Sequence, residues 1–554
     1  MMTEAQRAFS DELQYLKESL AQRRAPWETT WKDVSEFCIP KRSFWDNSGE
    51  REGGDYGRLL YNTTAVHAVG LSCSGFIGAT ASRTSRFFRL VTTDADLMAW
   101  PGIADYLETC ERNMYAILNR SNFYEAVAEL VPNGFTIGTA PLYIEDDDRN
   151  GRVIFQARHP KEIYVDEDDY GYVDTIIREY PISGKAALIK FGDKLPDDIR
   201  QQCKDNPVAR IMVQHIVLPS SDAYRDAFPG INGDMPYTSI WRLQATGDII
   251  AASGYWEFPY PTWRYAKNSD ETYGRSPAMD ALSEILGGNQ VAKSRLMAAQ
   301  YTSDPAFLTS QTLQGRDRLV PGGRIYISEK DEQMVAIEAG KNYPITVDTE
   351  RRIDETIERF FHTDIYVMLQ QAQRQMTALE VDARMSEKAA LLGPMTDRYN
   401  SEILAPAIKR TFQIAMRSGL IPPPPPIVIE QKATLDIDFV GYLSQLQKKH
   451  FQIGGMRASL EHIMAVAQIN PETLDVVDTD VLMREGLDGH GAPQKAIRET
   501  DEVQQIRARR AQQQQAMMQA QAQQEVMGKI AGNTDPNVVP TEGSIVDQVM
   551  KGQA

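Results

Sequence analysis

The longest amphipathic pattern of the chain runs from Met376 to Gly419, and it predicts one long helix. The pair Thr377 and Glu380 has the spacing of a capping box, which satisfies the first free amides of a helix. Gly419 can take the left-handed conformation that closes a helix, and the run of prolines after it forbids continuation. Such a helix spans about 60 Å. The pattern therefore indicates an elongated subunit built around helical struts.

Two prolines inside this stretch, Pro394 and Pro406, each remove a backbone donor and crowd the preceding turn. We therefore expect kinks at both positions. The alternative is a set of two or three shorter helices joined at the prolines.

A second predicted helix lies upstream, over residues 277–303. Ser276 is a suitable cap, and Pro277 would occupy the first helical position, where proline is favoured. Gly287 and Gly288 weaken the middle of this helix by about 1 kcal/mol each relative to alanine.

An insert, 305–345, follows with three strand-like runs and a Pro-Gly-Gly turn. From Thr346 a returning helix carries apolar residues at helical spacing as far as Ile365. A Gln-rich loop, 369–376, then leads into the long helix. The order is helix, small insert, helix, loop and long kinked helix.

The first half of the chain mixes both periodicities. Helical patterns cover 4–24, 60–82 and 101–133. From 138 to 257 the chain is dense in β-branched and aromatic residues broken by turns, with helical pieces over 183–204. The sequence therefore predicts an α+β protein of several domains.

The end of the chain is different in composition. A strand-like run at 435–443 and a helical region precede a tail from residue 500 that is rich in Gln, Ala and Met. This tail can form a helix but has little to bury, and its last part is typical of disordered chain.

The composition is that of a globular protein: 554 residues, 42% hydrophobic and 24% charged. The N-terminus is charged, so we expect no secretory signal, and no apolar run is long enough to cross a bilayer. Four scattered cysteines suggest a reducing environment and no disulfide framework. The net charge of −17 argues against binding nucleic acid by general adsorption, but it permits a protein past which nucleic acid moves without sticking.

Candidate chemistry is sparse. The run GGNQVAKS at 287–294 lacks the glycine that a phosphate loop needs before its lysine, and it lies inside a predicted helix. The seven histidines have no metal-ligand spacing. Two acidic clusters, 145–148 and 166–169, could bind a hard cation, but they are better explained as solvated turns. Arg507, Arg509 and Arg510 could contact nucleic acid or form a solvated helix face.

Three blocks carry a family resemblance: MTALEVDARMSEKAALLGPMTDRYNSEILAPAIKRTFQIAMRSGLIPPPP from Met376, PTWRYAKNSDETYGRSPAMDAL over 261–282, and HPKEIYVDEDDYGYVD over 159–174. They resemble the portal, or head-to-tail connector, proteins of short-tailed, T7-like bacteriophages. The resemblance covers residues 5–510, and beyond that only the composition matches.

The resemblance implies a portal fold with an α/β wing, a helical stem, a small α/β clip and a helical crown or barrel. The expected boundaries are 1–275 for the wing, 276–304 for the first stem helix, 305–345 for the clip, 346–369 for the second stem helix, 370–376 for a channel loop, 377–420 for a long kinked wing helix, 421–450 for the wing return, 451–510 for the crown, and 511–554 for a helical barrel or disordered tail.

The resemblance also implies a function without catalysis, cofactor or metal. Twelve copies would form a ring at one capsid vertex, through which double-stranded DNA enters during packaging and leaves during ejection. The expected channel-loop residues are Gln370, Gln371, Gln373, Arg374 and Gln375. Expected partners are the terminase large subunit, a tail adaptor, the major capsid protein, scaffolding protein and internal core or ejection proteins, with no membrane.

The ring would be assembled in the host bacterial cytoplasm and carried in the virion. Two other classes stay open at this point. One is an enzyme of DNA metabolism, such as the packaging ATPase, which the missing phosphate loop disfavours. The other is an internal scaffolding protein made of coiled coil, which the β-rich region disfavours.

Overall fold

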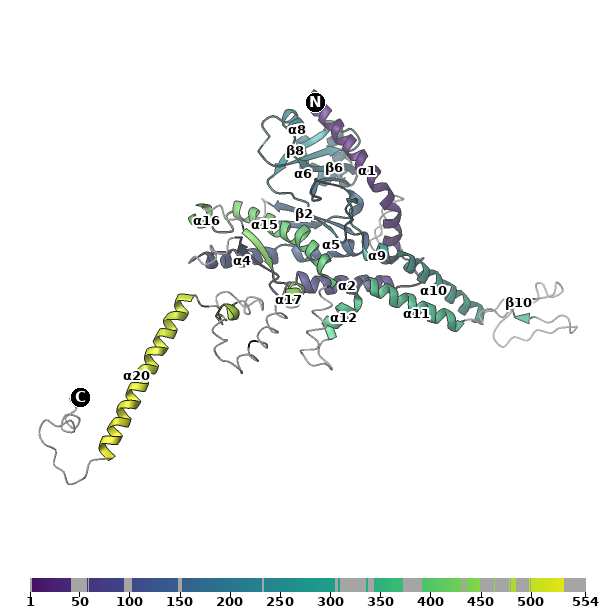
Figure 1. Ribbon diagram of the computed structural model, residues 1–554. Helices are drawn as coiled ribbons and strands as arrows, with labels where there is room; N and C mark the ends of the chain where they lie inside the picture. Colours follow the sequence, from purple (N-terminus) through teal and green to yellow (C-terminus); the bar gives the residue numbers. More distant parts are fainter. Residues whose placement is uncertain are drawn as a thin grey trace, which may run out of the picture. The chain divides into compact units, whose positions relative to one another are not determined.

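A computed structural model gives the fold of the chain (Figure 1). It describes residues 2–40, 57, 59–93, 102–147, 152–231, 234–303, 307–308, 335–336, 343–371, 391–430, 435–448, 463, 478, 480–484, 498 and 500–532. The chain divides into two compact units, Met1–Arg457 and Ala458–Ala554. Each unit is described by itself.

Helices precede the sheets in the first unit: α1 (Glu4–Cys38), α2 (Thr64–Thr80), α4 (Ile103–Arg120) and α5 (Phe123–Ile137), with strand β1 (Phe88–Thr92) before α4. The helix predicted at 4–24 is thus longer than its pattern suggested. It continues through Pro26 because Trp31 and Val34 extend its buried face. A capping box opens it, in which Thr3 and Gln6 exchange hydrogen bonds.

An antiparallel sheet of five strands forms the largest β element, in the order β4 (Ile163–Glu167), β5 (Val173–Ser183), β6 (Arg210–Pro219), β7 (Tyr237–Leu243) and β8 (Ile249–Tyr255). Its strands pair as neighbours in sequence, which confirms the β-rich region predicted from 138 to 257. One face, with Ile177, Ile216 and Ile240, packs against α1 and the short helix α8 (Asp222–Ala227).

The opposite face packs against α6 (Gly184–Phe191) and α7 (Asp197–Asp205), through residues that include Val213 and Trp241. Both faces are therefore covered, because neighbouring residues such as Ile240 and Trp241 point to opposite faces and both are apolar. The predicted helical pieces at 183–204 are confirmed.

Two smaller sheets complete this part. Strand β2 (Thr139–Asp147) pairs with β3 (Arg152–Ala157) on one side and β9 (Thr262–Arg264) on the other. Strand β1 pairs with β12 (Leu435–Phe439), which comes from the far end of the unit. The strand predicted over 435–443 is shorter, because α17 (Tyr442–Lys448) begins where it was expected to end.

The main core lies between α2, α5 and the helices that follow residue 391. Phe76, Trp263 and Tyr399 meet there, with the rings of Phe76 and Trp263 stacked at 5.6 Å. The four cysteines are buried as free thiols. Burial raises the pKa of Cys38 to about 12.

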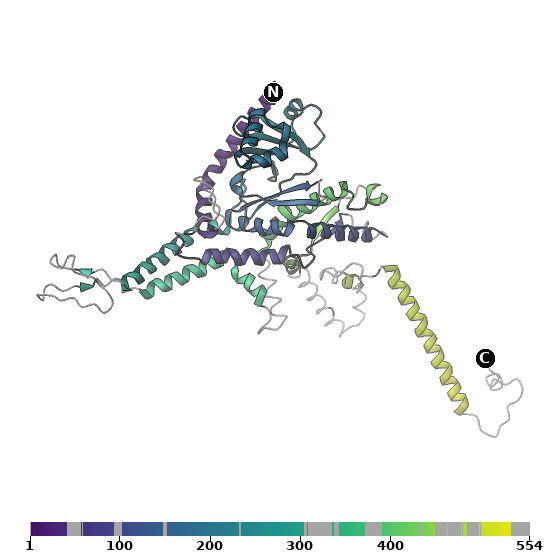
Figure 2. The ribbon, with the colours of Figure 1, turned by 180° about the vertical axis from the view of Figure 1, so that it is seen from behind.

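The predicted first strut consists of a single turn, α9 (Pro277–Asp280), and the helix α10 (Leu282–Ser303). The helix runs through Gly287 and Gly288 without a break. A Cβ atom on Gly288 would lie 2.9 Å from Ile353 Cγ2 of α11 (Tyr343–Phe360), whereas a Cβ atom on Gly287 would meet nothing. Gly288 thus allows the two helices to approach closely, side by side (Figures 1 and 2).

The returning strut, predicted as one helix to residue 369, is interrupted, and that part of the prediction is wrong. Helix α11 ends at Phe360, and α12 (Thr363–Gln371) starts after His362, whose φ is 52°. The Ser72 hydroxyl donates to the Phe361 carbonyl at 2.7 Å, so this oxygen is bonded to α2 at the break. The chain turns there and lays Tyr366 against α2.

The predicted long helix is described from Leu391, and it is divided into α14 (Gly393–Tyr399), a π-helical turn η6 (Asn400–Leu404) and α15 (Ala405–Arg417). Pro394 lies at the first turn of α14, after a turn residue at 392, so a separate segment does begin there. The backbone stays helical through η6 and Pro406 to Arg417, so the predicted irregularity at Pro406 is a π-helical turn and not a junction between separate helices. Gly419 has the predicted left-handed conformation, with φ of 70°. The predicted capping box at Thr377 lies outside the described residues. Helix α16 (Pro426–Glu430) follows the proline run.

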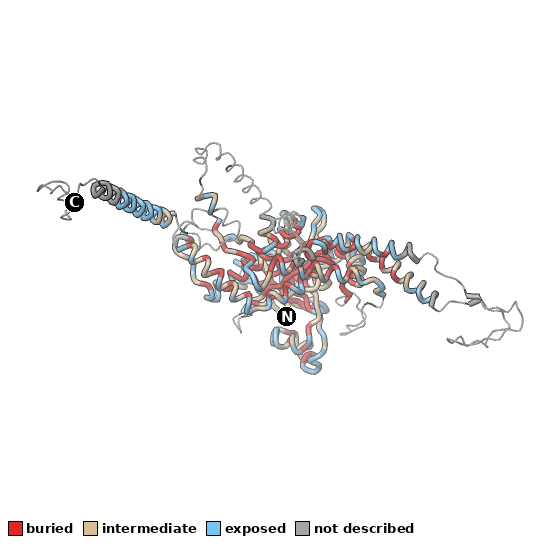
Figure 3. The backbone as a smooth tube through the Cα atoms, turned by 90° about the horizontal axis from the view of Figure 1, so that it is seen from below, coloured by how far each residue is buried: buried red, intermediate tan, exposed pale blue. Residues whose placement is uncertain are grey.

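In the predicted insert, the structure describes β10 (Phe307–Leu308) paired with β11 (Val335–Ala336). The second unit contains α20 (Thr500–Gly532), as the composition of the tail predicted. Its side chains are exposed from Arg507 to Gln521 (Figure 3).

The close contact between α2 and α12 gives a first prediction. A Cβ atom on Gly75 would lie 2.5 to 2.7 Å from atoms of Tyr366. Gly75→Ala should therefore lower the free energy of unfolding by about 1–3 kcal/mol through overpacking. Gly78, in the same helix, faces open space, so Gly78→Ala should raise it by up to about 1 kcal/mol. Thermal melting of both variants checks this, and equal shifts would contradict it.

Candidate functional site: the helix pair and its anchor

The helices α10 and α11 present two different outer faces. On α10 the exposed residues from 283 to 300 are uncharged: Ser283, Leu286, Gly287, Gln290, Ser294, Leu296, Met297, Ala299 and Gln300. On α11 the exposed residues from 347 to 360 include charges of both signs: Asp348, Arg351, Arg352, Glu355, Glu358 and Arg359. The charged residues of α10 are only partly exposed, and one of them, Arg295, is paired with Glu350. The most exposed face of α10 is therefore less charged than that of α11, which requires solvent or charged partners.

Polar contacts fix the base of the pair. Asn289 accepts from the backbone amides of Tyr61 and Asn62, at 2.6 and 3.1 Å. Asn62 in turn donates to Asp354 of α11 at 2.8 Å. The segment before α2 thus bonds to both helices, which holds them in one orientation.

The predicted loop residues are only partly within the described chain. Gln370 and Gln371 are the last residues of α12, so the helix extends two residues into the predicted loop. Gln373, Arg374 and Gln375 lie outside the described residues.

The helix that follows this loop is anchored by a buried ionic cluster, which the sequence analysis missed. Arg264, at the end of β9, is 2% exposed and donates to Glu402 in η6 through its backbone amide at 2.7 Å and its Nη2 at 2.7 Å. Its Nη1 donates to Glu167 at 2.7 Å. Two more ion pairs complete the cluster. Lys267 pairs with Glu167, and Arg398 pairs with Glu402.

The π-helical turn places Glu402 in this cluster. The amide of Ala405 donates to the carbonyl of Asn400, five residues back, and Pro406 has no amide to continue an ordinary ladder. The π-helical turn therefore lies where Glu402 is bonded to Arg264 of strand β9. No local signal in the sequence pairs Arg264 with Glu402, which are 138 residues apart.

A second set of contacts holds α15. Arg410, 4% exposed, donates to the carbonyl oxygens of Ile144 and Glu257, at 3.1 and 2.7 Å. Arg417 pairs with the Glu257 carboxylate at 2.6 Å. Helix α15 is thus held to β2 through Arg410, and to the segment between β8 and β9 through Arg410 and Arg417.

The acidic clusters have structural roles. Asp166 pairs with Arg23 at 2.9 Å, and Asp168 accepts the amides of Tyr170 and Tyr172 within its turn. In the other cluster Asp147 pairs with Arg152 across the β2–β3 hairpin. In the described part of the chain, no group of three or more His, Cys, Asp or Glu side chains is suited to hold a metal ion.

His215, on β6, is a histidine in the core. It is fully buried, bonded to Tyr260 at 2.7 Å and to Ser239 at 3.1 Å, and stacked on Trp241. Burial, and then the nearby Lys190, lower its pKa well below the usual range. A neutral imidazole sealed in the core has a packing role.

Two further candidates from the sequence are placed by the structure. The run GGNQVAKS lies inside α10, as predicted, and not in a strand-to-helix loop. Arg507 makes two contacts of 2.6 Å with Asp480 within the second unit, so it is engaged with protein. Among the described helices, none is both long and apolar enough to cross a membrane.

Comparisons with known proteins give a consistent answer. The chain matches the sequence model of a family described as bacteriophage head to tail connecting protein, over residues 10–497. It is 27% identical to a portal protein of Salmonella phage epsilon15 over 537 residues, 95% of this chain and 94% of that protein. It is also 27% identical to a probable portal protein of Bordetella phage BPP-1 over 510 residues, 90% and 91% of the two chains.

The buried cluster yields a second prediction. Glu402→Gln keeps the shape of the side chain but leaves Arg264 short of a countercharge, which should cost about 3 kcal/mol. The exposed pair Arg351–Glu355 is the matched control, and Glu355→Gln should cost at most about 0.5 kcal/mol. Chemical denaturation compares the two variants. A loss at Glu402 no larger than that at Glu355 would mean that the cluster does not anchor the helix.

Proposed function

The chain belongs to the family of bacteriophage head-to-tail connecting proteins, and from this premise we propose how it forms a conduit for DNA. It is a phage portal protein, a structural component of the virion and not an enzyme. The packaging-ATPase alternative is therefore set aside. The relationship to the short-tailed, T7-like group stays a prediction.

We propose that twelve copies close into a ring at one capsid vertex and that double-stranded DNA passes through its centre in both directions. The proposed parts are the wing, 1–275 with 377–450; the stem, 276–304 and 346–369; the clip, 305–345; the channel loop, 370–376; the crown, 451–510; and the barrel or tail, 511–554. Proposed partners are the terminase large subunit at the clip, a tail adaptor, the major capsid protein, scaffolding protein and internal core proteins.

One observation carries this proposal. Helices α10 and α11 lie side by side, they flank the insert, and α11 leads through a sharp turn into α12 and the segment before α14. This is the order of stem, clip, stem, loop and long helix that the resemblance implies. Antiparallel helices in close contact are suited to the wall of a channel, because all of their backbone groups are satisfied along the wall.

The charge of the chain supports the same function. At −17 per copy, a ring would repel phosphate over much of its surface. DNA could then move along the channel without being held by counterion release.

The ring gives a third prediction. Purified protein at micromolar concentration should be a closed assembly somewhat below a megadalton, because twelve chains of 62.3 kDa would form it. Light scattering gives the mass, and negative-stain images give the symmetry. A stable species with the mass of one chain would overturn the proposed ring.

We propose further that the loop 370–376 faces the DNA and that Arg374 is its cationic contact, among Gln370, Gln371, Gln373 and Gln375. The loop connects a stem helix to the anchored helix, so in a ring of this kind it would enter the channel. One arginine per copy gives a weak, salt-screened attraction that can grip DNA without arresting it.

The fourth prediction tests this loop. Arg374→Ala and Arg374→Glu should leave the ring intact but shorten the DNA retained in assembled particles, with the larger effect for the glutamate. Gln373→Ala is the matched control. If both arginine variants retain full-length DNA at the wild-type level, the loop is only a connector.

A further inference from the structure

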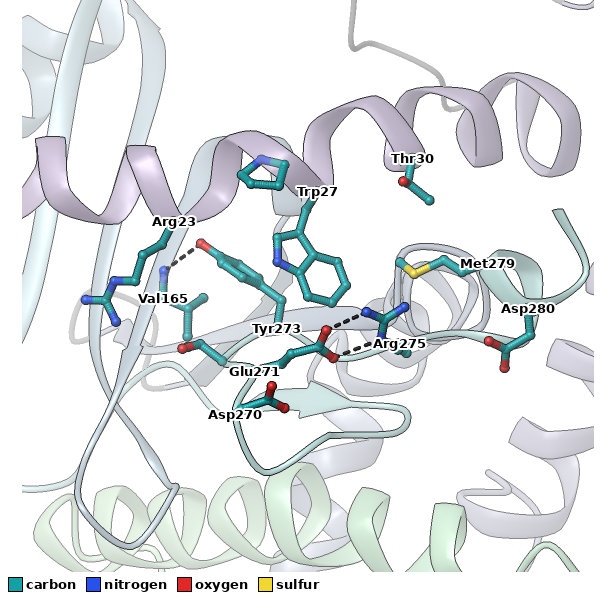
Figure 4. A pocket seen from close by; sticks show the side chains of 12 residues that line it. Arg23, Trp27, Thr30, Val165, Asp270, Glu271, Tyr273, Arg275, Met279 and Asp280 are labelled. Carbon is teal, nitrogen blue, oxygen red and sulfur yellow. Dashed lines mark hydrogen bonds and ion pairs between the residues drawn. The ribbon is translucent and has the colours of Figure 1, made fainter. Parts of the chain in front are cut away.

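A cavity of about 400 Å³ opens between α1 and the segment that leads into α9 (Figure 4). Trp27 of α1, Tyr273 and Met279 form its apolar wall. Its size is that of a site for a side chain or a small ligand. The cavity lies where the helix pair begins, since Asp280, at the end of α9, is part of its lining.

The charges in this cavity are not balanced. Three carboxylates and two guanidinium groups line it. Both guanidinium groups are already engaged: Arg275 with Glu271, and Arg23 with Asp166 outside the lining. Arg275 also lies near Asp270 and Asp280, but neither carboxylate forms an ion pair with any residue that the structure describes. Poor solvation raises the pKa of Asp280 by more than Arg275 lowers it. A basic group would be favoured here.

Arg359 of α11 is a positively charged residue that lacks a carboxylate partner. It is exposed and has no ion-pair partner among the described residues. It stands two residues after Ile357, and therefore about 200° around the helix from the side that faces α10. Arg359 therefore points away from α10, and it is not among the residues that line the cavity. The two halves of a head-to-tail contact must likewise come from different surface patches.

The two groups also lie at similar levels along the helix pair. Ile353 and Ile357 pack beside Gly288, and the helices run antiparallel. Arg359 therefore lies nearer to the start of α10, which follows Asp280. In the proposed ring, an axis along the pair would keep each group at its own level and would bring a neighbour's Arg359 to the level of this cavity.

We infer that the cavity is a contact site between copies, in which Asp280 receives the guanidinium group of Arg359 from a second copy of the chain. The inference rests on the proposed ring. Repulsion between acidic copies makes such opposite-charge contacts a means of fixing which surfaces meet. Tyr273 and Met279, in the apolar wall of the cavity, provide a surface on which the arginine stem can pack.

The test is charge reversal in the full-length chain. Asp280→Arg should raise the concentration at which half of the protein is in rings by about tenfold or more, and Asp280→Asn should raise it less. Asp198→Arg is the matched control, because Asp198 is also an exposed acid in the first turn of a helix. It should leave the concentration unchanged. Mass photometry measures the ring fraction, and circular dichroism verifies that each variant folds.

The double variant Asp280→Arg with Arg359→Asp tests whether Arg359 is the residue that contacts Asp280. Every copy of this variant carries the same pair with its charges reversed. Restored rings support the inference. No restoration, or equal restoration when Arg352→Asp replaces Arg359→Asp, overturns it. Rings of wild-type stability in Asp280→Arg also overturn it and leave the proposed function standing. Absence of rings in the wild-type protein would instead overturn the proposed function.

Discussion

The structure of the first unit depends on compensating one buried charge, that of Arg264. A guanidinium group taken out of water is costly unless its donors are paired, and here they meet two carboxylates and a backbone carbonyl. These acceptors come from the π-helical turn and from the end and following turn of β4. The same side chain therefore fixes the position of the helix after residue 391 against two different sheets.

Close backbone contacts complete this arrangement. Gly288 lets α11 approach α10, and Gly75 lets Tyr366 approach α2, so the chain into and out of the predicted loop is held on both sides. Such packing has little freedom to adjust, because interiors are as dense as organic crystals. A protein that connects a phage head to its tail benefits from helices held this rigidly.

How much of this could be predicted from the sequence depends on the range of the interaction. The pair of struts was predictable, because the cap at Ser276 and the apolar spacing after Thr346 are local signals. The break at His362 was not predictable, since the hydroxyl that donates to the Phe361 carbonyl at the break belongs to Ser72, 289 residues away. The pairing of Arg264 with Glu402 was not predictable for the same reason. Gly288 was predicted only to weaken its helix, whereas in the fold it allows α11 to approach α10.

The buried cysteines have a consequence for the particle outside the cell. A thiol reacts with oxidants as the thiolate, and burial raises the pKa values of Cys38, Cys110 and Cys203. All four thiols, including that of Cys73, are enclosed in the first unit. In a virion that leaves its host and persists in aerated water, the thiols of the connector would therefore be protected from oxidation and from unwanted disulfide cross-links.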